Sequence, residues 1–581
     1  MAVGTSNGTL TGGLVSFSIK IDGEAISKIY GVISIVVSKE INKVSSANII
    51  IQDGSASKQD FEISNEETFI PGKEIEILAG YRTDTDSIFK GIIIKHGIKI
   101  RPNGNSTLVL DCRDEAVKLT IGAKNKYFID KTDTDVIEEI IGTYSLDADI
   151  DASDITQKSL VQFNCTDWDF ILSRTEVNGK ICINNDGAIQ IKAPAIEGTA
   201  ALTLTYGKDI TDFDAAMDAR TQYQSVKAST WDPANYDIAE TDATDPAMDG
   251  NGNITPSDLA AVIGLDALNL KHTGMLPQEE LQAWADAQFL KSRLSKIRGR
   301  VGFMGSSALN PGDTLALDGL GDRMNGNVYV SAIRHEISEG TWHTDAQFGL
   351  SPDWFTQTYP VNAPPASGLL PAIQGLQIGI VSQLESDPEG EDRILVKIPI
   401  IDNNETGVWA RVACVDAGDN RGTFFRPEID DEVVVGFLNS DPRKPVVLGG
   451  LNSSSKPSPS PAKDDNNEKG YISRSEMKMI FNDDKKSVQI ETPAGKMVTL
   501  DEDAGVIKLE DENGNKITLS SDGITIESKK KITLKTDDDI EIQGKDIKNT
   551  AQGSFKADGT SGIELTSSAI AKLKGSLVQI N

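Results

Sequence analysis

Hydrophobic and polar residues alternate along much of the chain with the period of two that is typical of half-buried β-strands. In the N-terminal part of the chain, the alternating aliphatic positions lie between turn residues, at Ile19 and Ile21, Ile33 to Val37, Ile49 and Ile51, Ile75 and Ile77, and Ile92 and Ile94. Strand-like segments return between Val301 and Gly349. The pattern predicts a mainly β protein whose N-terminal part is a meandering sheet.

Two segments have helical features. Residues 166–172 begin with Thr and Asp side chains, which suit an N-cap and the first turn of a helix. Pro277 starts a longer segment with acidic residues early, basic residues late and Gly299 as the predicted end. The apolar stripe of this segment consists of Leu281, Trp284, Ala285, Gln288, Phe289 and Ser292. We therefore predict minor α structure within a mainly β fold.

A compact β unit is predicted between residues 375 and 451. Its five short strand segments are 378–381, 394–398, 409–415, 432–438 and 445–448. Five such strands in about 75 residues suit a small oligonucleotide/oligosaccharide-binding (OB) barrel. A Pro-rich linker at 364–367 precedes this unit, and a Ser, Pro and Asp-rich linker follows it. The predicted division of the chain is 1–365, 375–451, the linker 452–470, and 471–581.

The C-terminal part of the chain repeats one short pattern, in which two aliphatic residues flank one polar residue. The pairs follow one another at short and nearly regular intervals, from Val488/Ile490 to Ile540/Ile542. Each pair predicts a strand with one aliphatic edge, and a repeat this short cannot close a hydrophobic interior alone. The strands must therefore stack into a β-solenoid or intertwine with other copies of the chain. The predicted core residues are Val488, Ile490, Val498, Leu500, Ile507, Leu509, Ile517, Leu519, Ile524, Ile526, Ile532, Leu534, Ile540 and Ile542.

Charge and composition exclude several classes of function. The chain has 57 Lys and Arg against 87 Asp and Glu, a formal net charge of -30, which disfavours nucleic-acid binding through phosphate neutralisation. The longest apolar run, Val32 to Val37, is far shorter than the ~18–20 residues of a membrane helix. The N-terminus lacks the features of a signal peptide, so we expect synthesis in the cytoplasm. The four cysteines are widely spaced and are predicted to be buried thiols.

Two motifs suggest catalysis, but each has a stronger structural interpretation. Gly4 to Gly8 match G-x-S-x-G, yet a nucleophile elbow needs a preceding strand and a following helix. Asp167 and Asp169 form a carboxylate pair that helix capping explains. We predict no catalytic residue.

Two further motifs suggest a metal ion. His335, Glu336 and His343 do not have the spacing H-E-x-x-H, and alternate residues of a strand face opposite ways. The loop from Ala247 to Asp258 places glycine and isoleucine as a calcium loop does, but it lacks the first Asp and the bidentate Glu. A turn leading into a helix near Pro256 is the preferred interpretation, and we predict no metal site and no cofactor.

Four segments resemble the valine-glycine-repeat (VgrG) spike proteins of type VI secretion and related contractile injection machines, which are similar to the hub and spike of contractile phage tails. Residues 379–399 (GIVSQLESDPEGEDRILVKIP) and 409–451 resemble the small barrel of this family. Residues 283–303 (AWADAQFLKSRLSKIRGRVGF) and 333–350 (IRHEISEGTWHTDAQFGL) resemble its hub domain. The order of hub, barrel and β-needle is also that of the family.

The resemblance implies a homotrimer. Three copies would form a hub of β-barrel domains that matches a hexameric inner tube, a neck of three OB barrels, and an intertwined triangular β-helix. A proline-alanine-alanine-arginine (PAAR) repeat protein would cap the tip of this needle. We assign cap binding to the last strand, which consists of Leu577, Val578, Gln579, Ile580 and Asn581. Further expected partners are baseplate components, effectors and a target membrane that is pierced mechanically, but not nucleic acid.

The expected function is a non-enzymatic spike that caps the inner tube and punctures a target envelope to deliver effectors. The chain would leave the cell from a baseplate without a signal peptide, or in an extracellular injection particle. One alternative is a phage-like tail hub or baseplate spike with an associated lysin, for which the 452–470 linker is too short to hold an enzyme. The other alternative is a surface β-helical adhesin, or a polysaccharide-binding protein or lyase, which the missing signal peptide disfavours.

Overall fold

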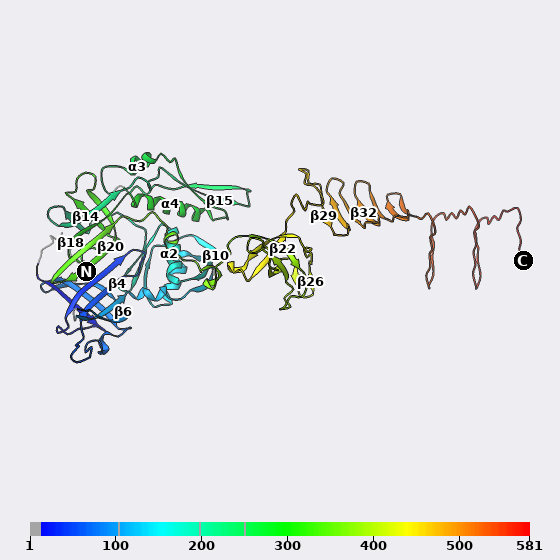
Figure 1. Cartoon of the computed structure of the whole chain (residues 1–581). Coiled ribbons are helices and arrows are strands. Elements are labelled where there is room, and N and C mark those ends of the chain that lie inside the picture. Colours follow the sequence, from blue (N-terminus) through cyan, green and yellow to red (C-terminus); the bar gives the residue numbers. More distant parts are fainter. Residues whose placement is uncertain (1–12, 103–104, 197–198, 249–250, 581) are drawn as a thin grey trace. The chain divides into compact units, whose positions relative to one another are not determined.

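The computed structural model describes residues 13–580 except 103–104, 197–198 and 249–250. It divides into two compact units (Figure 1). Unit 1 comprises Met1–Ile373 with Asn439–Asp441, and unit 2 comprises Gln374–Leu438 with Pro442–Asn581. The prediction of a mainly β fold with minor α structure is confirmed.

Unit 1 is built on a 13-stranded sheet with two groups of strands. The first group is β1 (Val15–Ile21), β2 (Glu24–Ala25), β3 (Val32–Glu40), β4 (Ser46–Gln52), β5 (Glu74–Tyr81), β6 (Asp84–Ile100) and β7 (Ser106–Arg113). The second is β13 (Leu202–Thr205), β14 (Ile210–Met217), β18 (Ile297–Met304), β19 (Thr314–Asp318), β20 (Gly326–Ser338) and β21 (Thr341–Phe348). Antiparallel pairing of β3 with β20, from Ser34 opposite Ser338 to Glu40 opposite Ala332, joins the groups.

The sheet borders two hydrophobic cores, the first formed mainly by the first group of strands and the second by the second group. Ile49 and Ile77 are among the buried residues of the first core, and Val301 and Phe348 are among those of the second. For Ile49 and Ile77 the alternation read from the sequence therefore corresponds to side chains that point inward. At residues 92–94 the predicted phase is wrong, because Ile93 is fully buried while Ile94 is 39% exposed, next to a register shift between β6 and β7.

Smaller sheets and helices complete unit 1. Its short sheets are β8 (Lys124–Thr132) with β10 (Thr156–Cys165), then β9 (Asp147–Ile150) with β11 (Ile181–Asn185) and β12 (Ala188–Lys192), and β15 (Val226–Asp232) with β16 (Asp237–Asp242) and β17 (Leu268–His272). The α-helices are α1 (Asp133–Gly142), α2 (Asp167–Val177), α3 (Pro256–Ile263), α4 (Gln278–Leu294) and α5 (Phe355–Thr358). Short 3-10 turns lie at Glu67–Phe69, Glu115–Thr120 and Pro365–Gly368.

The two predicted helices are present as α2 and α4. Thr166 caps α2 by accepting a hydrogen bond from the backbone N–H of Asp169. Helix α4 starts directly after Pro277 but ends at Leu294, so the predicted end at Gly299 is wrong. Gly299 lies in β18, where a Cβ atom would come within 2.5 Å of the Cβ of Ala215 in β14. Glycine at this position therefore serves close strand pairing and does not end the helix.

A buried ionic network ties three helices together. Arg174 of α2 donates to both carboxylate oxygens of Asp133 in α1, at 2.7 and 3.0 Å, and to Glu280 of α4 at 2.8 Å. Desolvation lowers the pKa of the guanidinium, but the two carboxylates together outweigh this effect and raise it. Removing one partner from such a buried network typically costs about 3–5 kcal/mol, because a buried charge is left without compensation.

Unit 2 contains a closed barrel of five strands, as predicted. The strands are β22 (Gln377–Gln383), β23 (Ile394–Lys397), β24 (Val408–Val412), β27 (Glu432–Phe437) and β28 (Pro445–Gly450). Gly379 lies against the core, where an added Cβ would come within 2.4 Å of Val396 and 2.8 Å of Val435. A short hairpin, β25 (Ala417–Gly418) with β26 (Arg421–Gly422), and a 3-10 turn at Leu438–Ser440 lie between barrel strands.

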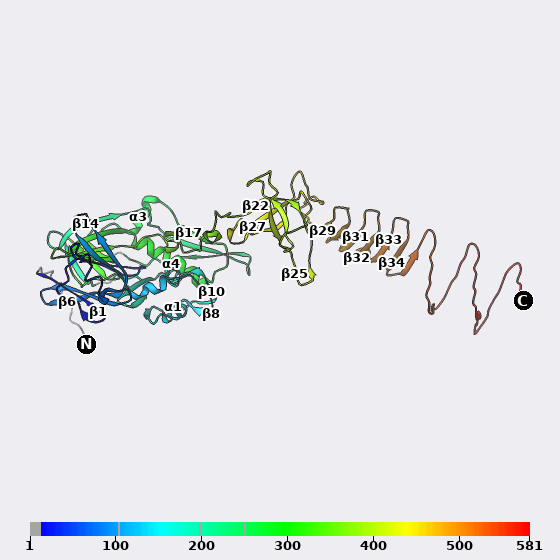
Figure 2. The same ribbon diagram turned by 60° about the horizontal axis from the view of Figure 1, so that its bottom comes forward.

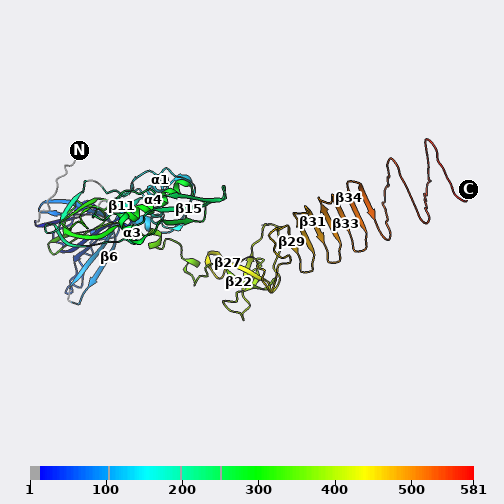
Figure 3. The ribbon, with the colours of Figure 1, turned by 90° about the horizontal axis from the view of Figure 1, so that it is seen from above.

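The C-terminal part of unit 2 is an antiparallel meander of seven five-residue strands (Figure 3). They are β29 (Glu468–Ile472), β30 (Lys478–Asn482), β31 (Ser487–Glu491), β32 (Met497–Asp501), β33 (Val506–Glu510), β34 (Lys516–Ser520) and β35 (Gly523–Glu527). Residues 528–580 contain no strand. The segments at Ile532/Leu534 and Ile540/Ile542, predicted as strands that stack or intertwine with other copies, therefore form no strand within the single chain.

Two further observations concern the whole described chain. None of its helices is both long enough and apolar enough to cross a membrane. Of the four cysteines, Cys112 and Cys182 are buried and Cys165 is partly buried, but Cys414 is exposed. The prediction that all four are buried is thus wrong for Cys414, which follows the end of the barrel strand β24.

Candidate functional site

The C-terminal meander places its aliphatic residues on one face. Residues that pair across antiparallel strands point to the same side of a sheet, so the register defines columns of side chains. One column consists of Val488, Leu500, Ile507, Leu519 and Ile524. The second column consists of Ile490, Val498, Leu509, Ile517 and Ile526. The first ten residues of the predicted needle core thus form a continuous surface, which we call the aliphatic face.

Within one chain, this aliphatic face is open to solvent. Ile507 is 43% exposed and Ile524 is 69% exposed, and no other segment of the described chain covers them as core. Burying a Val, Leu or Ile side chain fully stabilises a structure by about 1.5–3 kcal/mol. A side chain that is already half-buried can still gain about half of this free energy when a partner covers it. Covering all ten residues of the aliphatic face would therefore strongly favour association.

The opposite face of the meander is polar. Its central column consists of Gln489, Thr499, Lys508, Thr518 and Thr525. Ion pairs connect neighbouring parts of the meander, such as Lys516 with Glu527 at 2.6 Å and Lys496 with Glu512 at 3.0 Å. This face therefore suits contact with water, and the sheet has the two-sided character that an outer wall requires.

The aliphatic face extends further toward the N-terminus than the sequence pattern indicated. Phe481 pairs with Val488 and Met479 pairs with Ile490, so both continue the columns. Tyr471 pairs with Met479, and its ring lies 4.8 Å from that of Phe425 in the barrel loop. The sequence prediction missed these residues because Met479, Ile480 and Phe481 are all apolar, which hides the period of two. Their place opposite the Val488/Ile490 strand is the signal that could have found them.

The remaining predicted needle and tip residues are not brought together. Ile532, Leu534, Ile540 and Ile542 lie in the extended segment after Glu527, with their side chains exposed. Of the predicted cap-binding residues, Leu577, Val578 and Ile580 are exposed large apolar side chains at the C-terminal end. Gln579 lies among them and is also exposed, and Asn581 is outside the described residues.

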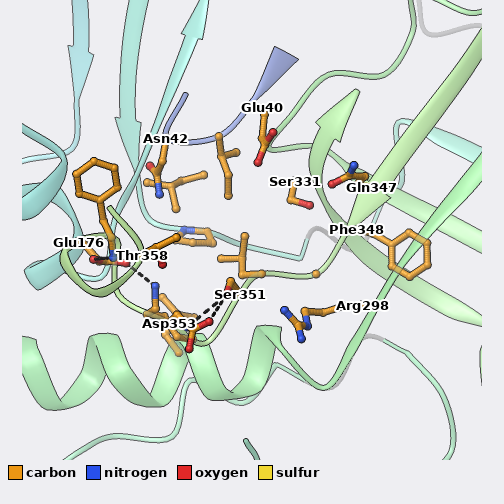
Figure 4. A pocket seen from close by; sticks show the side chains of 18 of the residues that line it. Glu40, Asn42, Glu176, Arg298, Ser331, Gln347, Phe348, Ser351, Asp353 and Thr358 are labelled. Atoms are coloured by element: carbon orange, nitrogen blue, oxygen red, sulfur yellow. Dashed lines mark hydrogen bonds and ion pairs between the residues drawn. The ribbon is translucent and has the colours of Figure 1, made fainter. Parts of the chain in front are cut away.

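A cavity of about 730 Å³ lies in unit 1, between β3, α2, α4 and the segment that follows β21 (Figure 4). Two of the carboxylates that line it, Glu176 and Asp218, already have partners. Glu176 accepts a hydrogen bond from the backbone N–H of Phe355 at 2.7 Å and forms an ion pair with Lys291. Hydrogen bonds from Arg220 lower the pKa of Asp218 to about 2. These contacts connect α2, α4 and the segment after β21, which favours a structural role for the polar lining.

The geometry of the motif His335, Glu336 and His343 does not suit a metal site. His335 pairs with Thr344 and Glu336 pairs with His343, so the two histidines point to opposite faces of the sheet. His335 is buried, its Nδ1 lies 2.9 Å from Thr344 Oγ1, and burial lowers its pKa to about 3. Within the described residues, no group of three His, Cys, Asp or Glu side chains is arranged to hold a metal ion.

The other motifs also have structural partners. Asp169 interacts with Thr166 at the cap of α2, whereas Asp167 accepts hydrogen bonds from Tyr144 and Gln162 in the interior. Capping therefore explains only Asp169. Burial, together with the bond to Asp167, raises the pKa of Tyr144 to about 12.

The loop that was compared with a calcium loop leads into α3, in agreement with the predicted turn before a helix near Pro256. Thr255 and Asp258 form a capping box at the start of this helix. The Lys296 ammonium group donates to the carbonyl oxygen of Asn251 at 2.7 Å, so a protein cation already binds the loop backbone. Asp249 of this loop and the Gly4 to Gly8 motif lie outside the described residues.

Comparison with known proteins gives two family matches. The Alg8 N-terminal domain model matches residues 11–339, which is more than half of the chain. The model of the type VI secretion system/phage-baseplate injector OB domain matches residues 377–451, the range that contains the five-stranded barrel.

Individual relatives share low identity with the chain. The type VI secretion system spike protein VgrG1b of Pseudomonas aeruginosa is 24% identical over 221 residues, which cover 34% of this chain and only 29% of that protein. A tail protein of Neisseria meningitidis has a TM-score of 0.44 and 14% identity, over 58% of this chain and 98% of that one. An E. coli component of the type VI secretion system has a TM-score of 0.36 and 12% identity, over 75% of this chain and 99% of that one.

Proposed function

The chain belongs to the Alg8 N-terminal domain family, and we propose that three copies of it form the spike of a contractile injection machine, a proposal supported by its injector OB domain. The resemblance to VgrG-type spike proteins read from the sequence is confirmed, and the injector OB domain is part of it.

The aliphatic face of the C-terminal meander is the observation that carries the proposal. A single layer of sheet cannot cover this face, and its columns have a regular register that a symmetric neighbour can match. The occupant we propose is the same face of two further copies, so that three sheets enclose one apolar interior with their polar faces outside.

The extended segment after Glu527 supports intertwining over a single-chain solenoid. Residues 528–580 have no strand partner within the described chain, although they keep exposed aliphatic residues such as Ile532 and Ile563. Backbone N–H and C=O groups in strands need partners, and in three wound chains the two neighbours supply them. The segment therefore becomes ordered as the triangular β-helix only when the trimer forms.

Mechanical puncturing follows from the charge on the needle. Lys508, Glu510, Lys516 and Glu527 lie on its polar face, and a charge at the centre of a bilayer costs about 2.5 kcal/mol or more. Spontaneous insertion is therefore unfavourable, and a contracting sheath would supply the work. In this role the hub caps a hexameric inner tube and contacts baseplate components. The whole assembly then carries effectors into the target.

We propose no catalytic role for the chain. After synthesis in the cytoplasm it would assemble at a baseplate and leave the cell by contraction, or travel in an extracellular particle. The C-terminal residues Leu577 to Asn581 would receive a PAAR-type cap, since exposed apolar side chains at the end of a needle need a cover. Deleting residues 575–581 should abolish cap binding while the trimer persists, and retained binding would refute this assignment.

The mass of the purified chain in solution tests the proposed function directly. Multi-angle light scattering should give three times the 62.5 kDa of one chain. A stable monomer of the full chain would contradict the proposal, because the aliphatic face would then remain uncovered in the functional form.

A further inference from the structure

A two-stranded ribbon of unit 1, formed by β8 and β10, has an apolar face in solvent. Tyr127 pairs with Val161, and both are exposed, as are Ile129 and Phe163 on the same side. Tyr127 and Phe163 are each 74% exposed. The other side of the ribbon packs Phe128 and Leu160 against the core formed with α1 and α2. The ribbon is thus anchored on one side, and its exposed aromatic side chains have no role in that core.

A second ribbon, formed by β15 and β16, has a similar exposed group. Trp231 pairs with Ile238, and Tyr236 at the turn contacts the Trp231 ring edge-on at 5.2 Å, while Tyr236 itself is 84% exposed. The opposite side of this ribbon packs Ala228 against α4. Both ribbons therefore combine a buried inner side with an exposed aromatic outer side.

The two ribbons have opposite charge. Residues 124–132 and 156–165, which we call the basic ribbon, contain four lysines and one aspartate. Residues 226–242, which we call the acidic ribbon, contain four carboxylates and one lysine. Lys126 and Lys131 both pair with Glu139 of α1, so one of these two positive charges remains uncompensated there. Exposed apolar faces on ribbons of opposite net charge are the features of complementary partners.

We propose that the basic ribbon of one copy packs on the acidic ribbon of the next copy around the threefold axis. This inference rests on the proposed trimer and adds a second contact, in the hub, to that of the needle. A closed ring of three needs such a heterologous contact, in which two different patches of the same chain meet. Both ribbons project from the same end of unit 1 (Figures 1 and 2), so rotation about an axis parallel to them brings unlike ribbons together.

Cysteine cross-linking in the full chain tests this contact. The background carries Cys414→Ser and Cys165→Ser, since Cys414 is exposed and Cys165 is a partly buried thiol of the basic ribbon itself. Chains with Phe163→Cys and chains with Tyr236→Cys are purified separately, mixed under denaturing conditions, refolded together and treated with a short bismaleimide. The expected result is a covalent two-chain product that needs both variants. With both substitutions in one chain, the product extends to three linked chains.

Two controls separate the possible results. Ile29→Cys replaces Tyr236→Cys in a matched control, because Ile29 is a similarly exposed apolar residue of unit 1 outside the ribbons, and no product is expected. Light scattering is carried out on the same samples. A trimer without the cross-link would overturn the ribbon contact and leave the proposed function intact, whereas a monomer would overturn both.

A charge exchange provides a second measurement. Lys158 is exposed on the basic ribbon, where it forms an ion pair with Asp130 at 2.8 Å, and Glu240 lies on the outer side of the acidic ribbon. Lys158→Glu should slow formation of the cross-link several-fold at low salt, and adding Glu240→Lys should restore most of the rate. If the cross-linking rate were the same for the parent, Lys158→Glu and the double variant, charge would not guide this contact, against the proposal.

Discussion

The N-terminal sheet of unit 1 and the C-terminal meander share one sequence pattern but differ in what covers their aliphatic side chains. Ile49 and Ile77 in unit 1 are fully buried, whereas Ile507 and Ile524 in the meander are 43% and 69% exposed. The first sheet combines strands from distant parts of the chain, and its buried side chains form a core within unit 1. The meander is a single layer of five-residue strands. Alternation therefore specifies which face is apolar, but chain topology determines whether the same molecule covers it.

Charged substitutions on the meander should have the largest effect. We expect Ile526→Asp to abolish trimer formation, because three carboxylates would enter the proposed apolar interior near the threefold axis. Thr525→Asp on the polar face is the matched control and should leave the trimer intact. Light scattering of both variants checks this.

The same test applies beyond the described strands. Asp at Ile532 or Leu534 should also prevent trimerisation, while Asp at Thr533 should be tolerated, if the extended segment keeps the same alternation in the assembly. Equal effects at odd and even positions would contradict the intertwined register.

A smaller but clear effect is expected in the 13-stranded sheet of unit 1. Ile77→Ala removes a fully buried side chain from the core of unit 1 and should lower the free energy of unfolding by about 2–5 kcal/mol. Because this core is complete within one chain, the loss should not depend on protein concentration. Ile507→Ala should instead shift the concentration at which trimers form.

Chemical denaturation at several chain concentrations distinguishes these two substitutions. A concentration-dependent effect of Ile77→Ala would mean that the unit 1 core also needs its neighbours. A concentration-independent effect of Ile507→Ala would mean that the meander is stable without neighbouring copies of the chain.

The comparison also explains how far the sequence could predict the molecule. The barrel strands and the shared face of the aliphatic pairs followed from periodicity, since a local pattern of two residues sets the direction of each side chain. The end of α4 at Leu294 did not, because pairing of Gly299 with β14 depends on a strand much earlier in the chain. Residues 528–580 also depart from the sequence pattern, because no other segment of the described chain pairs with their backbone.

Acid should destabilise unit 1 through His335. Burial lowers the pKa of this histidine to about 3, while its unfolded value is about 6.5. The unfolded chain therefore binds a proton that the folded chain excludes, so stability is full above about pH 6.5 and falls as the pH drops toward 3. The slope from this group alone is at most about 1.4 kcal/mol per pH unit, since one proton is taken up on unfolding.

His335→Gln should remove this slope when unfolding of the variant and the parent is compared from pH 7 to 4. All four histidines lie in unit 1, so no histidine contributes to the pH dependence of the meander's stability. A pH dependence that is unchanged by the substitution would assign the acid sensitivity to carboxylates.

The smallest effect is expected for an ion pair on the polar face of the meander. Lys516 and Glu527 are 2.6 Å apart, but both side chains are about half exposed, and exposed pairs contribute about 0.2–1 kcal/mol. Lys516→Gln should therefore change the unfolding midpoint only slightly, and 1 M salt should reduce even this difference. Arg174→Gln, which removes the buried partner of Asp133 in unit 1, should cost several times more. If the two substitutions had equal effects, the polar face of the meander would be buried in the assembly, and the proposed orientation of the three sheets would have to be reversed.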